Sequence, residues 1–250
     1  MQIKPIPRRH YGHAPITEAI ISLRFEPDDG IGIPDLQNIQ SKLKPEYPRS
    51  GEQLAVHFEL NAQERSGKTD RPQTVGHQFF SEDQKRIVRV SRTEFAFSQL
   101  APYDRWETLR AEAKQVWAIV QKELRPHRIS RVGVRFINRI DIPCPPSGVE
   151  LDNYFHAAPK IPPELPQGLS TYFVRLEIPF DPPAGVLILA LAAAPPVAMD
   201  VVSTLLDLDA IRQNLATDPE SAWSTIEELR DVNNAAFEAS ITDAARDLFK

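Results

Sequence analysis

The sequence predicts an α+β protein in which one antiparallel sheet is backed on one face by long helices, and it predicts that this arrangement is built twice. Short segments of the first half recur in the same order in the second half. The matching pairs are residues 23–25 with 134–136, 56–60 with 174–178, and 105–109 with 222–226. A repeat fixes architecture more firmly than a local motif does. We therefore expect two β-α-β-β-β-α units, 1–126 and 127–250, within one pseudo-symmetric domain.

The elements of the first unit follow from the spacing of its apolar residues, which has period two in strands and about 3.6 in helices. We expect a strand at 18–26, a short helix at 35–44, strands at 53–62, 74–80 and 85–98, and a helix at 104–125. The long helix carries an apolar stripe from Trp106 to Leu124. Pro126 follows the helix and stops it.

The second unit repeats this order. We expect strands at 129–142, 171–180, 185–193 and 197–206, a short helix at 150–158, and a closing helix that begins near Asp218 and Pro219. An N-cap residue followed by proline is a common way to start a helix. The apolar stripe of the closing helix runs from Trp223 to Leu248. Asn233 and Asn234 interrupt it, and they mark either a kink or a polar edge of the stripe.

If the long helices pack on one face of a continuous sheet, the opposite face should be polar. Strand alternation places nine polar residues there: Arg24, His57, Glu59, Arg131, Arg135, Arg139, Asp141, Arg175 and Glu177. In topology, this pattern resembles the duplicated saddle fold of the TATA-binding-protein type. The alternative is a helix-grip fold, in which a curved sheet wraps one dominant helix. Two long helices favour the saddle.

The arginines of this face allow two interpretations. A row of guanidinium groups can bind phosphates of a nucleotide or nucleic acid in bidentate fashion. Alternatively, the arginines form cross-strand ion pairs with acids of the same face. Glu26, Glu59, Asp141 and Glu177 nearly balance the five arginines, which favours ion pairing. The net charge of −5 also argues against a general nucleic-acid binder.

A catalytic set is not evident from the sequence. The best candidate is His57 beside Glu59, with Arg175 on the same face, but an isolated surface histidine is far commoner than a general base. Cys144 lies between two prolines without a visible histidine partner. His10 and His13 lack further ligands at zinc spacing. We therefore predict neither a metal site nor a cofactor.

Composition limits the setting in which the protein works. Cys144 is the only cysteine, so no intrachain disulfide can form, which fits a reducing cytoplasm. The longest apolar run, residues 185–197, is too short to cross a bilayer as a helix. We expect a cytoplasmic protein without membrane association.

Three stretches resemble a sporadically distributed family of uncharacterised bacterial proteins of about this length. They are residues 15–25, 131–140 and 232–243, and they are spread over the whole chain. The resemblance implies a bacterial, cytoplasmic protein from mobile or defence-type gene neighbourhoods. It implies no particular activity.

These observations favour a non-enzymatic binding or regulatory protein. It would hold a protein or peptide partner, or another copy of itself, on the polar sheet face or in the groove between the repeats. The expected binding residues are Arg24, His57, Glu59, Arg131, Arg135, Arg139, Arg175 and Glu177. The alternatives are a nucleic-acid or nucleotide binder that uses the arginine row, and an enzyme with an unrecognised site.

Overall fold

The computed structural model of the protein describes residues 3, 6–7, 9–28, 30, 32–55, 58–61, 66–69, 73–182, 184–218 and 220–250. In chain order the elements are β1 (Ile16–Glu26), α1 (Ile33–Leu43), β2 (Arg49–Ala55), β3 (Phe58–Asn61), β4 (Ser66–Thr69), β5 (Gln73–Phe80), β6 (Arg86–Ser91), β7 (Glu94–Leu100), α2 (Trp106–Leu124), β8 (Arg128–Pro143), a 3-10 turn (Leu151–Asn153), β9 (Phe173–Phe180), β10 (Gly185–Ala194), β11 (Val201–Thr217), α3 (Ala222–Ser240) and α4 (Asp243–Asp247).

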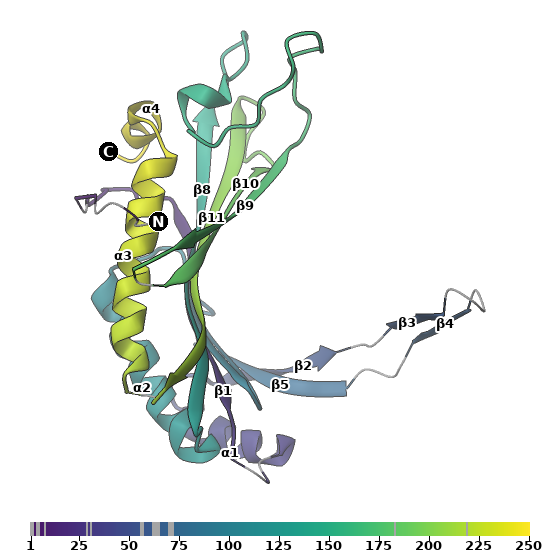
Figure 1. Ribbon diagram of the computed structural model, residues 1–250, viewed down its shortest axis with the longest axis vertical. Helices are drawn as coiled ribbons and strands as arrows, with labels where there is room; N and C mark the ends of the chain where they lie inside the picture. Colours follow the sequence, from purple (N-terminus) through teal and green to yellow (C-terminus); the bar gives the residue numbers. More distant parts are fainter. Residues whose placement is uncertain are drawn as a thin grey trace.

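Nine of these strands form one antiparallel sheet, in the order β2-β5-β6-β7-β1-β8-β11-β10-β9. Strands β3 and β4 form a separate hairpin that projects from the end of β2 and β5 (Figure 1). The sheet and the helices confirm the predicted α+β class. The first and second halves of the chain meet where β1 pairs with β8, in a register that sets Ile21 opposite Val134.

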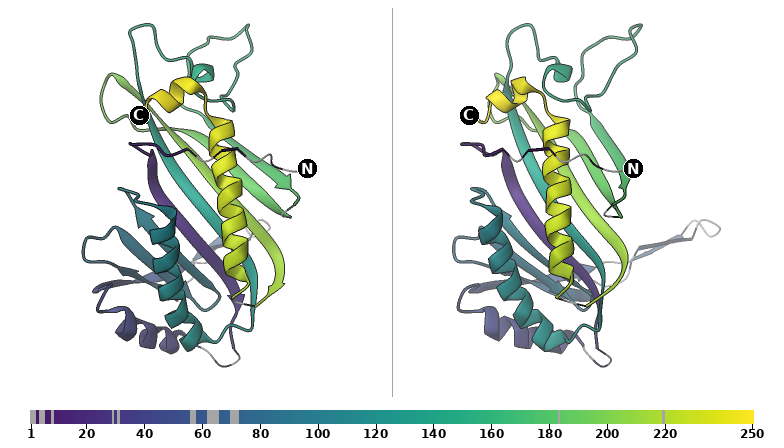
Figure 2. Two further views of the ribbon diagram at one scale, coloured as in Figure 1. Left: turned by 90° about the vertical axis from the view of Figure 1, so that its left-hand side faces the viewer. Right: turned by 60° about the vertical axis from the view of Figure 1, so that its left-hand side comes forward.

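The helices lie on one side of the sheet, as Figures 1 and 2 show. Helix α2 covers the strands of the first half and α3 covers β8 and β11, while α1 packs beside α2 over β5 and β6. The sheet bends toward its other side, which carries no helix in the described part of the chain (Figure 1). We call this other side the open face. No helix among the described residues has both the length and the apolar character needed to cross a membrane.

The core fills the space between the sheet and the helices. Trp117 of α2 is almost fully buried, and its ring lies 5.4 Å from the ring of Phe25 on β1 and 5.3 Å from that of Phe95 on β7. The buried residues of α2 are those of the predicted stripe: Trp106, Leu109, Ala113, Val116, Trp117, Val120 and Leu124. The 3.6-residue period of the sequence therefore identified the buried face of this helix correctly.

The closing helix is shorter than the stripe predicts, and it has no break at the asparagines. Helix α3 runs through Asn233 and Asn234 to Ser240, and Ile241 is extended. The chain then starts α4, whose N-cap Thr242 accepts a hydrogen bond from Ala245 N. Asn233 lies within the buried face of α3, not at its edge.

Several predicted strands have different bounds. The segment 53–62 is not one strand: β2 ends at Ala55, and β3 belongs to the separate hairpin. Residues 85–98 form two strands, because the Ser91 hydroxyl accepts from Thr93 N and Glu94 N and closes a turn. Strand β11 is far longer than the predicted 197–206. The short helix expected at 150–158 is a single 3-10 turn.

Trp117 offers a test of this core. Trp117→Ala should lower the free energy of unfolding by about 3–5 kcal/mol, because it leaves a cavity between β1, β7 and α2. Trp117→Phe should cost less, since Nε1 of Trp117 has no hydrogen-bond partner among the described residues. Urea unfolding followed by circular dichroism measures both. Equal losses for the two variants would contradict this account.

Candidate functional site

The arginines predicted for the polar sheet face do lie on the open face. Successive side chains of β8 point to opposite faces of the sheet. The ring of Phe136 lies on the helix side, with its centre 6.3 Å from that of the Trp106 ring on α2. Even-numbered residues of β8 therefore face the helices, and Arg131, Arg135 and Arg139 point away from them. Arg24 of β1 stands opposite Arg131 in the register, so it shares this face.

Each guanidinium at the centre of the open face is paired with a carboxylate. Arg135 makes two hydrogen bonds to Asp207 of β11, one of them between Nε and Oδ1 at 2.8 Å. Nη2 of Arg131 lies 3.5 Å from Oδ2 of Asp209 on the same strand. Since β11 extends to Thr217, it brings both acids beside β8. The strand predicted from the sequence ended at residue 206 and therefore did not include these two acids.

The outer arginines are paired as well. Arg24 binds Glu94 of β7, and Arg175 binds Glu177 within β9. Arg139 binds Asp141 (3.1 Å) and also donates to the carbonyl oxygen of Pro195 (2.6 Å). All five predicted arginines thus have acidic partners. This is the ion-paired alternative of the sequence analysis, with Asp207, Asp209 and Glu94 in place of Glu26 and Glu59.

The predicted cluster of His57, Glu59 and Arg175 is not assembled on the sheet. His57 lies outside the described residues. Glu59 belongs to β3, in the separate hairpin, and only its backbone is described. Arg175 lies on β9, at the opposite end of the strand order from β2. The sequence match of 56–60 with 174–178 therefore relates segments whose strands, β3 and β9, belong to different sheets.

One carboxyl group between β8 and β11, that of Asp209, has a shifted proton affinity. Burial raises the pKa of Asp209, while the charges of Arg131 and Arg135 act in the opposite direction. The pKa of Arg135 is raised above its usual value, chiefly because Asp207 accepts its hydrogen bonds. The charges at the centre of the open face therefore depend on one another, since each pair is partly withdrawn from water.

A second candidate surface lies on the helix side, between the two halves. A cavity of about 460 Å³ opens between the start of α2, the middle of β8 and the second half of α3. We call it the inter-helix groove. Its aromatic lining consists of Tyr11, Tyr103, Trp106, Phe136 and Phe237, and its polar lining includes Asn138, Arg230, Asn233 and Asn234. Volumes of roughly 300–1,000 Å³ are typical of ligand pockets.

The aromatic wall of the groove is held by specific contacts. The ring of Phe136 meets that of Tyr103 edge-on at 5.9 Å. The indole nitrogen of Trp106 donates to Glu227 of α3, with distances of 3.1 and 3.0 Å to the two carboxylate oxygens. The guanidinium of Arg230 lies 5.9 Å from the centre of the Trp106 ring, a cation–π geometry. The two contacts of Trp106 join α2 to α3 beside the groove.

Two buried asparagines line the groove. Asn138 Nδ2 donates to Leu206 O at 3.0 Å, and Asn233 Nδ2 donates to Val134 O at 2.7 Å. Asn233 is only 1% exposed, and its Oδ1 has no hydrogen-bond partner among the described residues. An unpaired buried carbonyl oxygen costs free energy unless something donates to it. Asn233 lines the groove, so this oxygen becomes available to a ligand only when the side chain turns toward the cavity.

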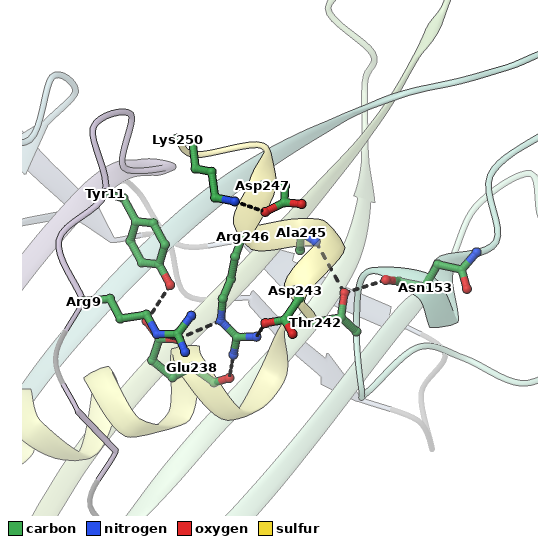
Figure 3. A network of polar contacts seen from close by, with 10 residues as sticks. All are labelled: Arg9, Tyr11, Asn153, Glu238, Thr242, Asp243, Ala245, Arg246, Asp247 and Lys250. Atoms are coloured by element: carbon green, nitrogen blue, oxygen red, sulfur yellow. Dashed lines mark hydrogen bonds and ion pairs between the residues drawn. The ribbon is translucent and has the colours of Figure 1, made fainter.

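The N-terminal segment, which crosses α3 (Figure 2), also lines the groove. Figure 3 shows how it is attached: the Tyr11 hydroxyl donates to Glu238 Oε1 at 2.6 Å, and Arg9 lies 3.9 Å from the same carboxylate. Arg246 of α4 binds Glu238 from the other side at 3.0 Å. Burial and the hydrogen bond to Glu238 raise the pKa of Tyr11 to about 12, so this phenol stays a donor at neutral pH.

Sequence reasoning did not select Tyr11, Asn138, Asn233 or Glu238 as site residues. Two signals pointed to them: Asn233 interrupts an apolar helix stripe, and three of the four lie in stretches that carry the family resemblance. Comparison with models of known protein families gives no match to this chain. A search of curated proteins gives no match either.

The raised pKa of Asp209 leads to a prediction about pH. A carbon NMR titration should place this pKa above the ordinary value, and Arg131→Gln should raise it further, because the opposing positive charge is lost. The folded protein then binds this proton more tightly than the unfolded chain. The contribution of Asp209 to stability should therefore fall as the pH rises through the raised pKa.

Arg24→Gln is the matched control for this titration. Its partner Glu94 is exposed on β7, so the change removes one positive charge from the open face without touching β11. The pKa of Asp209 should stay unchanged. A pKa of Asp209 below the ordinary value in the wild type would refute the burial argument.

The Glu238 carboxylate allows a test of the attachment in Figure 3. Its side chain is only 2% exposed. Arg246→Met should lower the free energy of unfolding by about 3–5 kcal/mol, because a buried charge loses its main partner. The double variant Arg246→Met with Glu238→Leu should recover much of this loss. Chemical unfolding measures both, and a double variant no more stable than the single one would speak against the pairing.

Proposed function

We propose that the protein is a non-enzymatic binding protein that holds an apolar or aromatic segment of a protein or peptide partner in the inter-helix groove. The observation that carries this proposal is the combination of an aromatic wall with the unpaired carbonyl oxygen of Asn233. In this proposal a peptide side chain contacts the rings, and Asn233 turns toward the groove to accept a backbone N–H of the peptide. Aromatic walls with a few placed polar groups are typical of binding sites.

The charges of the open face support a groove ligand over a nucleic-acid ligand. The five predicted arginines are paired with carboxylates of the same chain, and the net charge is −5. Phosphate binding at this face would have to break ion pairs that already exist. The lining of the groove instead includes one buried polar atom, Asn233 Oδ1, that has no partner among the described residues.

We also propose that 1–126 and 127–250 are structural repeats that form a saddle. The strand order supports this: each half has its first strand at the centre, β1 or β8, and its last strand, β7 or β11, beside it. In each half a helix of 19 residues, α2 or α3, follows the last strand. In this arrangement the groove is the seam between equivalent helices. A cytoplasmic location and membership of the bacterial family remain predictions from the sequence.

Selection from a random peptide library tests the binding function. The wild-type protein should enrich peptides that share an aromatic or large aliphatic residue, and Asn234→Trp should weaken their binding by about tenfold or more, because the indole fills the groove. Fluorescence of labelled peptides measures the affinities.

Ala239→Trp is the matched control. It adds the same side chain to an exposed position of α3 that does not line the groove, and binding should stay at the wild-type level. The proposal fails if no peptide is enriched, or if Asn234→Trp binds the selected peptides as well as the wild type does. Turnover of nucleotides, esters or nucleic acid by the purified protein would also refute a non-enzymatic role.

A further inference from the structure

Strand β9 ends the sheet with an open edge. Among the described residues it is the last strand in the order, and it pairs with β10 on one side only. Its apolar side chains are exposed on both faces of the sheet: Phe173 is 68% exposed, Leu176 42% and Ile178 38%. Figure 2 shows β9, in green, at the outer border of the sheet beyond β10. Exposed, apolar edges of this length are templates for pairing with another strand.

The ladder with β10 shows which backbone groups of β9 are free. Ala193 N donates to Tyr172 O at 3.0 Å, and hydrogen-bonded pairs alternate along an antiparallel ladder. Val174, Leu176 and Ile178 therefore bond to β10. Phe173, Arg175, Glu177 and Pro179 direct their backbone groups outward. Pro179 has no N–H, which fits its place in the outward set.

The side chains of β9 make this edge complementary to itself. We propose that β9 pairs antiparallel with β9 of a second copy, with Leu176 on the two-fold axis, so that two nine-stranded sheets become continuous. In this register Arg175 stands opposite Glu177 of the second copy, on the open face, and the reciprocal pair is identical. Both residues belong to the outward set, so they exchange N–H···O bonds in both directions.

The apolar residues match in the same register. Val174 stands opposite Ile178 of the second copy on the helix side, next to the two Leu176 side chains. Phe173 stands opposite Pro179 on the open face. A shift of the register by two residues would instead set Arg175 against Arg175, or Glu177 against Glu177, and like charges directly opposite each other are unfavourable. The charges of the strand thus select one register and an isologous contact between two copies.

This surface is separate from the inter-helix groove, so the two proposals can fail independently. Analytical ultracentrifugation of the full chain should give twice the monomer mass of 28.2 kDa. Arg175→Glu and Glu177→Arg should each weaken the dimer by about tenfold or more, because every cross-strand ion pair becomes a repulsion. Mixing the two variants should restore a dimer, since the charges are complementary again.

Two controls separate the interface from general effects on folding. Arg24→Glu reverses the charge of a comparable exposed ion pair on β1 and should leave the dimer intact. Glu177→Pro removes an outward N–H without touching the ladder to β10, so it should give a folded monomer. Circular dichroism confirms folding of each variant.

Crosslinking tests the register. In a Cys144→Ser background, Leu176→Cys should form a disulfide-linked dimer on mild oxidation, because the axis brings the two thiols together. Ile178→Cys should not, since its counterpart is Val174. A wild-type protein that stays monomeric at its highest soluble concentration would overturn the proposal. So would a dimer that survives both charge reversals and Glu177→Pro, or one that crosslinks equally at both positions.

Discussion

The antiparallel pairing of β1 with β8 is the interaction on which the rest of the structure depends. On one side of this pair the sheet continues through β7, β6, β5 and β2, and on the other through β11, β10 and β9. Its side chains serve both faces: Ile21 and Val134 enter the core, while Arg24 and Arg131 lie on the open face. A slip of one residue would exchange these two sets, and burial of the apolar set prevents it.

The groove follows from this central pairing. Helix α2 covers the strands of the first half and α3 covers β8 and β11, so a seam remains between the two helices. Phe136 and Asn138 of β8 lie beneath it, and Trp106, Glu227 and Arg230 bridge its walls. The segment around Tyr11 then crosses α3 and is held by a buried carboxylate. The residues that line the groove therefore come from both halves of the chain, and no single contiguous motif forms this site.

The sequence allowed the layers of this fold to be predicted better than the site. The stripe of α2 and the alternation of β1 and β8 have strong periods. The stripe is buried as predicted, and the arginines predicted for the polar face of β1 and β8 do lie on the open face. Strand ends were less certain because they depend on turns: the Ser91 turn divides one predicted strand, and β11 continues past residue 206 where Asp207 and Asp209 alternate with buried Leu208 and Ala210. The groove between the repeats was predicted as one possible site, but its residues could not be foreseen, since Tyr11, Asn138 and Glu238 meet only after folding. Asn233 was noticed as an irregularity of a stripe, but its contact with Val134 crosses from a helix to a strand.

The ion pairs of the open face have a consequence for what this surface tolerates. Each of the five predicted arginines there already holds a counter-ion that is tethered to the same backbone, at an effective concentration that a free anion seldom matches. A polyanion would have to displace these tethered carboxylates from the arginines one by one. A partner surface that carries both positive and negative groups could instead bind the arginines and the carboxylates together, because it supplies both signs of charge. These ion pairs thus protect the open face from non-specific binding of anions, although the face is rich in arginine.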